Sequence, residues 1–206
     1  MVALTFDDGP KPGVTDKILD ILEQYHVRAT FFVCGWRFDS PESWAIAQRA
    51  VALGCEIGNH SWSHEDLQRR NYVAVRRSIQ ETNDKIFEIT GYHPHSLRPP
   101  AGHNSWDIIR VARDNDMALV FWTQSGNVHE VDPKKIAQNV QKQIVDGKEL
   151  QNGDIILLHD TKPLMVDAVE IIVPQLLEKG YQLVTVWELL NCSETGFVPG
   201  ELYDHG

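Results

Sequence analysis

The chain has 206 residues, of which 42% are hydrophobic and 23% are charged, and its formal net charge is −10 with a pI near 5.3. This length and composition are typical of one ordinary globular domain, which we expect to cover residues 1–206. No run of Lys or Arg offers a stripe that neutralises a phosphate backbone, so no nucleic-acid partner is expected. The apolar runs are too short to cross a bilayer, so no transmembrane segment is expected either.

Three cysteines, Cys34, Cys55 and Cys192, are odd in number and widely separated. This spacing argues against a disulfide framework, although one bridge stays open, and against a thiolate metal site. A β-rich run already begins at residue 2, from which we expect that a signal peptide or an upstream domain has been removed. The sequence does not define the oligomeric state.

Runs rich in β-formers alternate with amphipathic helical patterns along the chain. Seven strands are predicted, at residues 2–6, 29–34, 56–58, 96–97, 118–122, 155–158 and 183–186. Helices are predicted after Thr15 as N-cap, between Ser40 and Gly54, from Val75 to Gly91, from Asn104 or Ser105, from Asp132–Pro133, and over 166–180 with a kink or a late start at Pro174. The tail over residues 192–206 is predicted to be irregular.

Strands that alternate with helices favour a parallel sheet with helical crossovers, either closed as a barrel or open and doubly wound. Polar residues directly follow four of the strands: Asp7–Asp8, His60, Arg98 and His159. Four such loops converge most naturally at the C-terminal mouth of a barrel, whereas an open sheet spreads them. We therefore predict an α/β fold, a single-domain barrel with about seven parallel strands.

Two adjacent carboxylates, Asp7 and Asp8, end the first strand. One of two neighbours that face different ways can bind a metal while the other accepts a proton. His60 and His64 lie four apart, a spacing that on a helical turn places both imidazoles on one side, close enough for one metal ion. A carboxylate with two imidazoles leaves coordination positions open, as catalytic metal sites do. The alternatives are a helix cap or Asx-turn and a loop that is His-rich by chance.

Two further segments carry candidate catalytic groups. The prolines of the run after Arg98 fix an extended path that holds a backbone N–H still, as an oxyanion donor requires, and Arg98 itself can orient a carboxylate base. His159 ends an apolar strand, and its imidazole titrates near ~6.5 when unperturbed, which makes it the candidate general acid. The alternatives are a surface turn with a solvated Arg and a structural His.

Taken in order, the motifs TFDDGP (5–10), NHSWSH (59–64), LRPPAG (97–102) and ILLHD (156–160) resemble the series of the polysaccharide deacetylase family, of the NodB or carbohydrate esterase 4 type. The resemblance implies a distorted (β/α) barrel with fewer than eight strands. It also implies a hydrolase that removes N-acetyl groups from chitin or peptidoglycan, or O-acetyl groups from xylan. An acetylated carbohydrate is then the partner, and an extracellular or cell-envelope location is expected.

The resemblance also assigns roles to the residues of the motifs. It makes Asp8, His60 and His64 the ligands of a zinc ion, with cobalt as an accepted substitute. Asp7 becomes the base, with Arg98 as its partner, the Ala101 N–H faces the oxyanion, and His159 is the acid. Leu157 lines the acetyl pocket, and Pro100 and Trp62 are expected to contact the substrate, with Trp36, Trp62 and Trp106 as candidate stacking surfaces.

The sequence departs from the family pattern at two places. Ala101 stands where many relatives have an aromatic residue, which removes a sugar contact but leaves the backbone N–H. No Asp-Trp pair follows Trp122, whereas relatives commonly use its Asp to tune the catalytic His. Glu130 and Asp132 are the nearby carboxylates that can take its place.

Four functions follow from these residues. A deacetylase of N-acetylglucosamine-containing glycans is the first, and an acetylxylan O-acetyl esterase is its nearest rival. The altered loop after Trp122 leaves open a carbohydrate-binding protein with little or no turnover on the same scaffold. A glycosidase that uses Asp7, Asp8 and His159 without a metal is the fourth.

Overall fold

A curled parallel β-sheet forms the centre of the molecule in the computed structural model, which describes residues 1–126, 129–142, 150–192 and 196–206. Its strand order is β6-β7-β1-β2-β3-β4-β5-β9, with β8 paired to β1. The strands are β1 (Val2–Asp7), β2 (Thr30–Val33), β3 (Glu56–Asn59), β4 (Ser96–Leu97), β5 (Ala118–Val120), β6 (Gln124–Ser125), β7 (Ile155–His159), β8 (Leu183–Val184) and β9 (Leu202–Tyr203).

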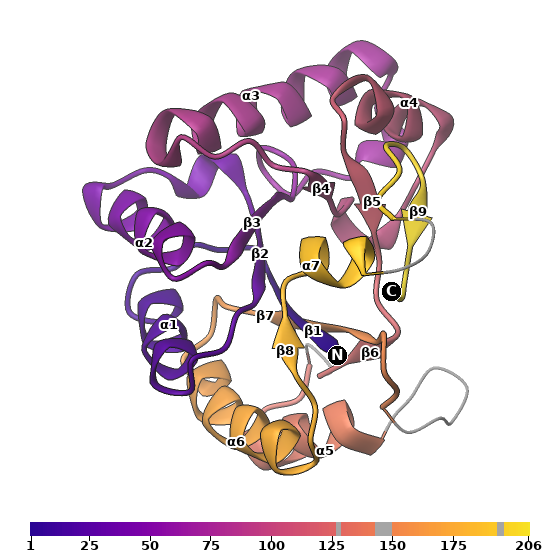
Figure 1. Cartoon of the computed structure of the whole chain (residues 1–206). Coiled ribbons are helices and arrows are strands. Elements are labelled where there is room, and N and C mark those ends of the chain that lie inside the picture. The colour runs from indigo at the N-terminus through magenta and orange to yellow at the C-terminus, as the bar shows by residue number, and fades with distance from the viewer. Residues whose placement is uncertain (127–128, 143–149, 193–195) are drawn as a thin grey trace.

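The two flanks of the sheet are joined by the stretch of chain that runs from β5 to β6 (Figure 1). β5 pairs with β4, and β6, which follows it in the chain after residues 121–123, pairs with β7. Because one continuous stretch contacts both flanks, the sheet curls into a distorted barrel, and the fold class predicted from the sequence is confirmed.

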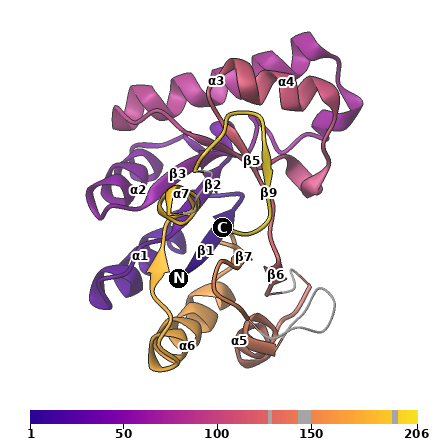
Figure 2. The same cartoon turned by 45° about the vertical axis from the view of Figure 1, so that its right-hand side comes forward.

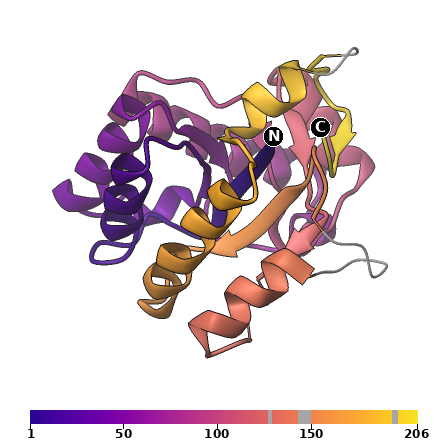
Figure 3. The ribbon, with the colours of Figure 1, turned by 60° about the horizontal axis from the view of Figure 1, so that its bottom comes forward.

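Helices surround the curled sheet. They are α1 (Thr15–Gln24), α2 (Pro41–Ala52), α3 (Tyr72–Thr90), α4 (Trp106–Asp114), α5 (Pro133–Lys142), α6 (Leu164–Glu178) and α7 (Val186–Asn191). Figures 1 and 2 show α1 to α4 following one another around the outside, and Figure 3 shows α5 and α6 side by side near β7. None of the described helices has the length and apolar character that crossing a membrane requires.

The helix ends follow local signals in most places. Ser40 caps α2 in a capping box, and Gly91 ends α3 in the left-handed conformation at φ 69°. Thr15 is already helical, because Val14 occupies the cap position and the Thr15 hydroxyl is used elsewhere. α6 begins at Leu164, so Pro174 lies inside the helix and does not delay its start.

Alternation along β1 separates two cores. Val2, Leu4 and Phe6 pack toward the helices, whereas Ala3 faces the barrel interior together with residues of α7. α7 covers one end of the barrel, the end at which both chain termini lie (Figure 1). With that end closed by apolar side chains, the polar residues at the carboxyl ends of the strands gather at the opposite mouth.

Nine strands are present among the described residues, where the sequence predicted about seven. The two additional strands are β6, whose two residues are polar, and β9, which follows the turn residues Pro199 and Gly200, so neither stands in a run rich in β-formers. β9 also corrects the prediction of a wholly irregular tail, since Leu202 pairs with Leu119 and Tyr203 with Val120. Figure 2 shows β9 alongside β5.

Candidate active site

Asp7 is the last residue of β1 and is buried at the mouth of the barrel. Arg98 Nη1 donates to Asp7 Oδ1 at 2.8 Å and to Thr5 Oγ1 at 2.7 Å. Arg98 is itself fully buried and is held by the carbonyl oxygens of Val120 and Phe121, at 3.1 and 2.9 Å. Because its Nε and Nη2 are held by these carbonyls, the guanidinium fixes Oδ1 of Asp7, whereas Oδ2 lies 3.7 Å from His60 Nε2.

Asp8 turns away from the strand at φ 75° and faces two imidazoles. Its Oδ1 lies 3.5 Å from His60 Nε2 and 3.4 Å from His64 Nε2, and among the described residues it has no hydrogen-bond partner. Ligand atoms around a tetrahedral zinc stand about 3.3 Å apart when the metal–ligand distance is about 2.0–2.1 Å. One carboxylate oxygen and two imidazole nitrogens at this spacing fit a divalent metal ion.

The Nδ1 nitrogen of His60 fixes which ring nitrogen is available to bind a metal ion. This nitrogen lies 2.6 Å from the carbonyl oxygen of Arg98, which accepts only, so Nδ1 carries the proton and Nε2 is left for a metal. Burial opposes the charged imidazole, but Asp7 and Asp8 outweigh it and raise the pKa of His60. In turn, burial disfavours the Asp8 carboxylate, and His60 with the other histidines outweighs burial and lowers the pKa of Asp8.

His60 and His64 do not lie on a helical turn, as the sequence analysis assumed. They belong to a tight turn in which Ser61 and His64 have positive φ angles of 67° and 56°. The Asn59 side chain accepts from the Ser61 backbone N–H at 2.8 Å and stabilises this turn. The turn, rather than helical spacing, brings both imidazoles to Asp8.

His159 ends β7 directly beside Asp7, because these two residues are partners in the parallel register of β1 and β7. Burial lowers the pKa of His159, and the Asp7 and Asp8 carboxylates only partly counteract it. No hydrogen bond to its imidazole is formed within the described residues. Glu130 accepts instead from the N–H groups of Val131 and Asp132, and Asp132 accepts from the N–H of Lys134, so neither carboxylate is bonded to His159.

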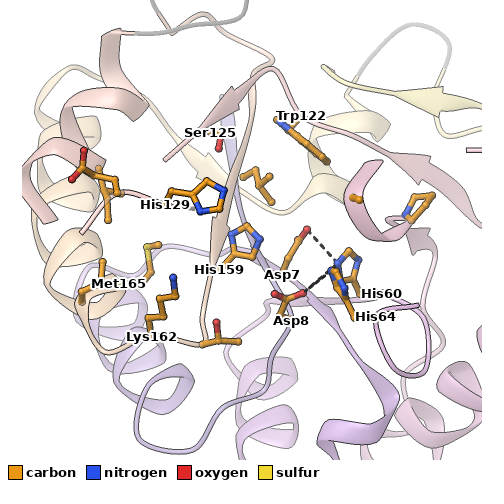
Figure 4. A pocket seen from close by; sticks show the side chains of 17 residues that line it. Asp7, Asp8, His60, His64, Trp122, Ser125, His129, His159, Lys162 and Met165 are labelled. Carbon is orange, nitrogen blue, oxygen red and sulfur yellow. Dashed lines mark ion pairs between the residues drawn. The ribbon is translucent and has the colours of Figure 1, made fainter. Parts of the chain in front are cut away.

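These groups open into a cavity of about 500 Å³. Figure 4 shows Asp7, Asp8, His60 and His64 on one side of His159, and His129, Lys162 and Met165 on the other. The cavity is lined by Asp7, Asp8, His60, His64, Pro99, Ala101, Trp122, Ser125, His129, Glu130, Ile136, Leu157, His159, Thr161, Lys162, Leu164 and Met165. One open pocket therefore combines the polar groups with an apolar wall.

The predicted substrate contacts are only partly in this pocket. Leu157 and Ala101 line it, and Ala101 adopts a left-handed φ of 58°. Pro100 is buried outside the lining, although its neighbour Pro99 contributes to it. Trp62 lies in a separate groove of about 320 Å³ with residues of α3, because the positive φ of Ser61 turns the loop outward.

Several lining residues were not identified from the sequence. Trp122 and Ser125 follow or end β5 and β6, and Thr161 and Lys162 follow β7. Their position directly after a strand could have indicated them, since side chains after the carboxyl ends of barrel strands face the mouth. Ile136, Leu164 and Met165 come from the first turns of α5 and α6, where no sequence pattern distinguishes them from ordinary core residues.

A comparison with protein-family models matches residues 1–120 to the polysaccharide deacetylase model, which is more than half of the chain. The chain belongs to the polysaccharide deacetylase family. The motifs at residues 5–10, 59–64 and 97–102 lie within the matched region, whereas ILLHD at 156–160 lies beyond it. The structure brings polar residues of all four motifs together at one mouth.

Curated relatives extend this match over most of the chain. It is 41% identical over 191 residues to the peptidoglycan-N-acetylmuramic acid deacetylase PdaC of Bacillus subtilis (strain 168), covering 92% of the chain and 38% of PdaC. It is 34% identical over 196 residues to a peptidoglycan-N-acetylglucosamine deacetylase of Bacillus cereus (strain ATCC 14579), covering 93% of the chain and 88% of that protein. The chain thus spans well under half the length of PdaC.

Among solved structures, a family 4 acetyl xylan esterase from Clostridium thermocellum, in complex with a cobalt ion, superimposes with a TM-score of 0.86. It is 34% identical, and the match covers 99% of this chain and 98% of the esterase. The similarity thus includes the strands and loops on both sides of the mouth. A divalent metal fits the Asp8, His60 and His64 cluster in the same fold.

Proposed function

We propose that the protein removes N-acetyl groups from N-acetylglucosamine-containing glycans of the peptidoglycan or chitin type. The observation that carries this proposal is Asp8 Oδ1, which has no hydrogen-bond partner among the described residues and faces two imidazole nitrogens beside the Asp7–Arg98 pair. Curated relatives named as peptidoglycan deacetylases support the substrate class, and they also support a location in the cell envelope.

Asp8, His60 and His64 would hold the metal, which we propose to be zinc. A divalent ion there would supply Lewis acidity to a water molecule and to the acetyl carbonyl. Asp7 accepts the proton of the water through Oδ2, since Oδ1 is held by Arg98. Ala101 lines the pocket, and its backbone N–H would stabilise the oxyanion that forms when the water oxygen bonds to the carbonyl carbon.

His159 completes the reaction as the proposed acid. It donates a proton to the sugar nitrogen while the carbon–nitrogen bond breaks, so that acetate and a free amine leave the site. Its position beside Asp7 lets base and acid face the same acetyl group from one edge of the sheet. Leu157 supplies an apolar wall for the methyl group of the acetyl. Pro100 restricts the backbone conformation directly before Ala101 and so helps to hold the Ala101 N–H in place.

Acetylxylan esterase activity is the second candidate, favoured by the 0.86 TM-score to an acetyl xylan esterase. A binding protein with little turnover is the third, favoured by the missing hydrogen-bond partner of His159 within the described residues. The metal-free glycosidase is not supported, because Asp8 faces histidines and Asp7 is paired with Arg98.

The test is acetate release from chito-oligosaccharides, peptidoglycan glycan strands and acetylated xylan, each with zinc and with a chelator present. We expect zinc-dependent release from the first or second substrate, and analysis of the glycan strands shows whether glucosamine or muramic acid is formed. Release from xylan alone would assign the esterase function. No release from any of the three would support the binding protein.

A further inference from the structure

Asp160 is a buried acidic residue that the proposed reaction does not use. It directly follows His159 and is fully buried. A Cβ added at Gly9 would stand 2.1 Å from Asp160 Oδ2 and 2.5 Å from Oδ1. The Asp160 carboxyl therefore fills the space that the glycine leaves empty in the loop between β1 and α1.

Hydrogen bonds join Asp160 to both ends of this loop. Its backbone N–H donates to the Asp7 carbonyl oxygen at 3.4 Å. Its Oδ2 accepts from the Thr15 hydroxyl at 2.6 Å, and the same hydroxyl accepts from the Lys11 N–H at 2.7 Å. These contacts lie on either side of Asp8, so Asp160 spans the segment that carries both carboxylates of the site, with its backbone N–H on one side and its carboxyl on the other.

The carboxyl acts there through its shape and its hydrogen bonds rather than its charge. Its Oδ1 accepts no hydrogen bond from the described residues, which is unfavourable for a buried carboxylate. Burial raises the pKa of Asp160 to about 7 against the hydrogen bond from Thr15, and Asp8 and Asp7 add to the rise. An amide has the same shape and can accept from Thr15 in the same way.

We propose that Asp160 is a positioning residue that fixes the Asp7–Asp8 loop against the strand that carries His159. The inference rests on the proposed deacetylase reaction. The register of β1 and β7 already holds Asp7 beside His159, so this junction sets where Asp8, which leaves the strand, lies relative to both. A misplacement of about 1 Å is enough to lower turnover on the order of 100-fold.

Asp154 provides a matched control at the opposite end of the same strand. It is also buried, and its Oδ1 also accepts from a threonine hydroxyl, that of Thr123, at 2.8 Å. Asp154→Ala therefore removes the same kind of contact far from the mouth. Comparison of Asp160→Ala with Asp154→Ala separates a loss of position from a loss of stability.

We expect Asp160→Ala to lower kcat for acetate release by about 10- to 100-fold with little change in KM. Asp160→Asn restores most of this turnover, and Asp154→Ala lowers the melting temperature but leaves kcat near that of the wild type. Zinc affinity, measured by chelator competition, gives a readout without turnover: Asp160→Ala binds zinc more weakly than Asp154→Ala, because Asp8 moves with the loop.

Equal kcat losses in Asp160→Ala and Asp154→Ala would overturn the proposal, and so would an Asp160→Asn variant as impaired as Asp160→Ala. If the wild-type protein released no acetate from any glycan, the proposed function would fail instead. In that case the zinc measurement alone decides the positioning role, and an unchanged zinc affinity in Asp160→Ala overturns it.

Discussion

Adjacent carboxylates at the end of β1 have different surroundings because the backbone turns between them. Asp7 keeps the strand conformation, faces the barrel interior and is held by Arg98. Asp8 adopts a positive φ and faces His60 and His64. In the proposed reaction the same residue type therefore serves for proton transfer at one position and for metal binding at the next.

Substitution of the two aspartates tests this division. Asp8→Ala removes the oxygen between the imidazoles, so we expect both metal content and acetate release to be lost. Asp7→Asn leaves that oxygen in place, and we expect metal content to be retained while turnover falls by about 10²- to 10⁴-fold. Metal analysis and acetate assays on the same preparations provide the measurement. Asp20→Asn, on the exposed face of α1, is the control, and full metal content in Asp8→Ala would contradict the assignment.

Asp160 is expected to make the stability of the metal-free protein depend on pH. In the folded state burial raises the pKa of Asp160 from 3.8 to about 7, so between these values the folded protein binds more protons than the unfolded chain. The stability that this proton contributes is complete below the lower value and is lost as the pH rises toward about 7. We expect urea midpoints to fall more steeply over this range for the wild type than for Asp160→Asn. Parallel curves would contradict the raised pKa.

At the scale of elements, Glu56 connects α7 to the barrel. It is buried in β3 and accepts from the Thr30 hydroxyl at 2.9 Å, the Ser96 hydroxyl at 2.6 Å and the Trp187 N–H at 2.9 Å. A carboxylate at the first turn of α7 also satisfies a backbone donor that has no partner within the helix. The Glu56 side chain, from the first half of the sequence, thus attaches α7, which closes the barrel.

Glu56→Ala leaves these three donors without their acceptor. We expect the free energy of unfolding to fall by about 2–5 kcal/mol, since each unsatisfied buried donor costs about 1–3 kcal/mol and hydroxyls can rotate. Glu188→Ala removes a more exposed cap of the same helix, in which Glu188 accepts from the Thr185 N–H, and should cost about 1 kcal/mol. Urea unfolding of both variants measures the difference, and equal losses would exclude the role of Glu56.

At the scale of the whole molecule, the sequence predicted the barrel because its strands alternate with helices and polar residues follow the strands. It did not predict β6 and β9, since Gln124 and Ser125 are polar residues with little β propensity and β9 follows the turn residues Pro199 and Gly200. Trp62 lies in a separate groove, so its predicted contact with the substrate stays a prediction. The side-chain partners of Asp160 lie in α1 and were beyond any local pattern.

The tail beyond residue 196 contributes to the stability of the whole barrel through β9. Leu119 and Phe121 donate their N–H groups to the carbonyl oxygens of Glu201 and Tyr203, at 2.9 and 2.6 Å. We expect a chain shortened after residue 196 to unfold at a lower urea concentration and to associate more readily, because β5 becomes an open edge. Val198→Ser, an exposed position in the same tail, is the control. Unchanged stability and unchanged light scattering would contradict this role.

The pairing of β1 with β7 also orders the assembly of the site in time. Asp8, His60 and His64 belong to the first third of the chain and follow β1 and β3, whereas Arg98, which orients His60, comes later in the chain. Asp160 reaches the Asp8 loop, and His159 reaches Asp7, only after the last third has folded back. Contacts between such distant segments carry the largest loop-closure entropy and form slowly. A nascent or refolding chain is therefore expected to bring the three proposed metal ligands together first, and to bind the ion tightly and become active only when Asp160 and His159 arrive beside β1.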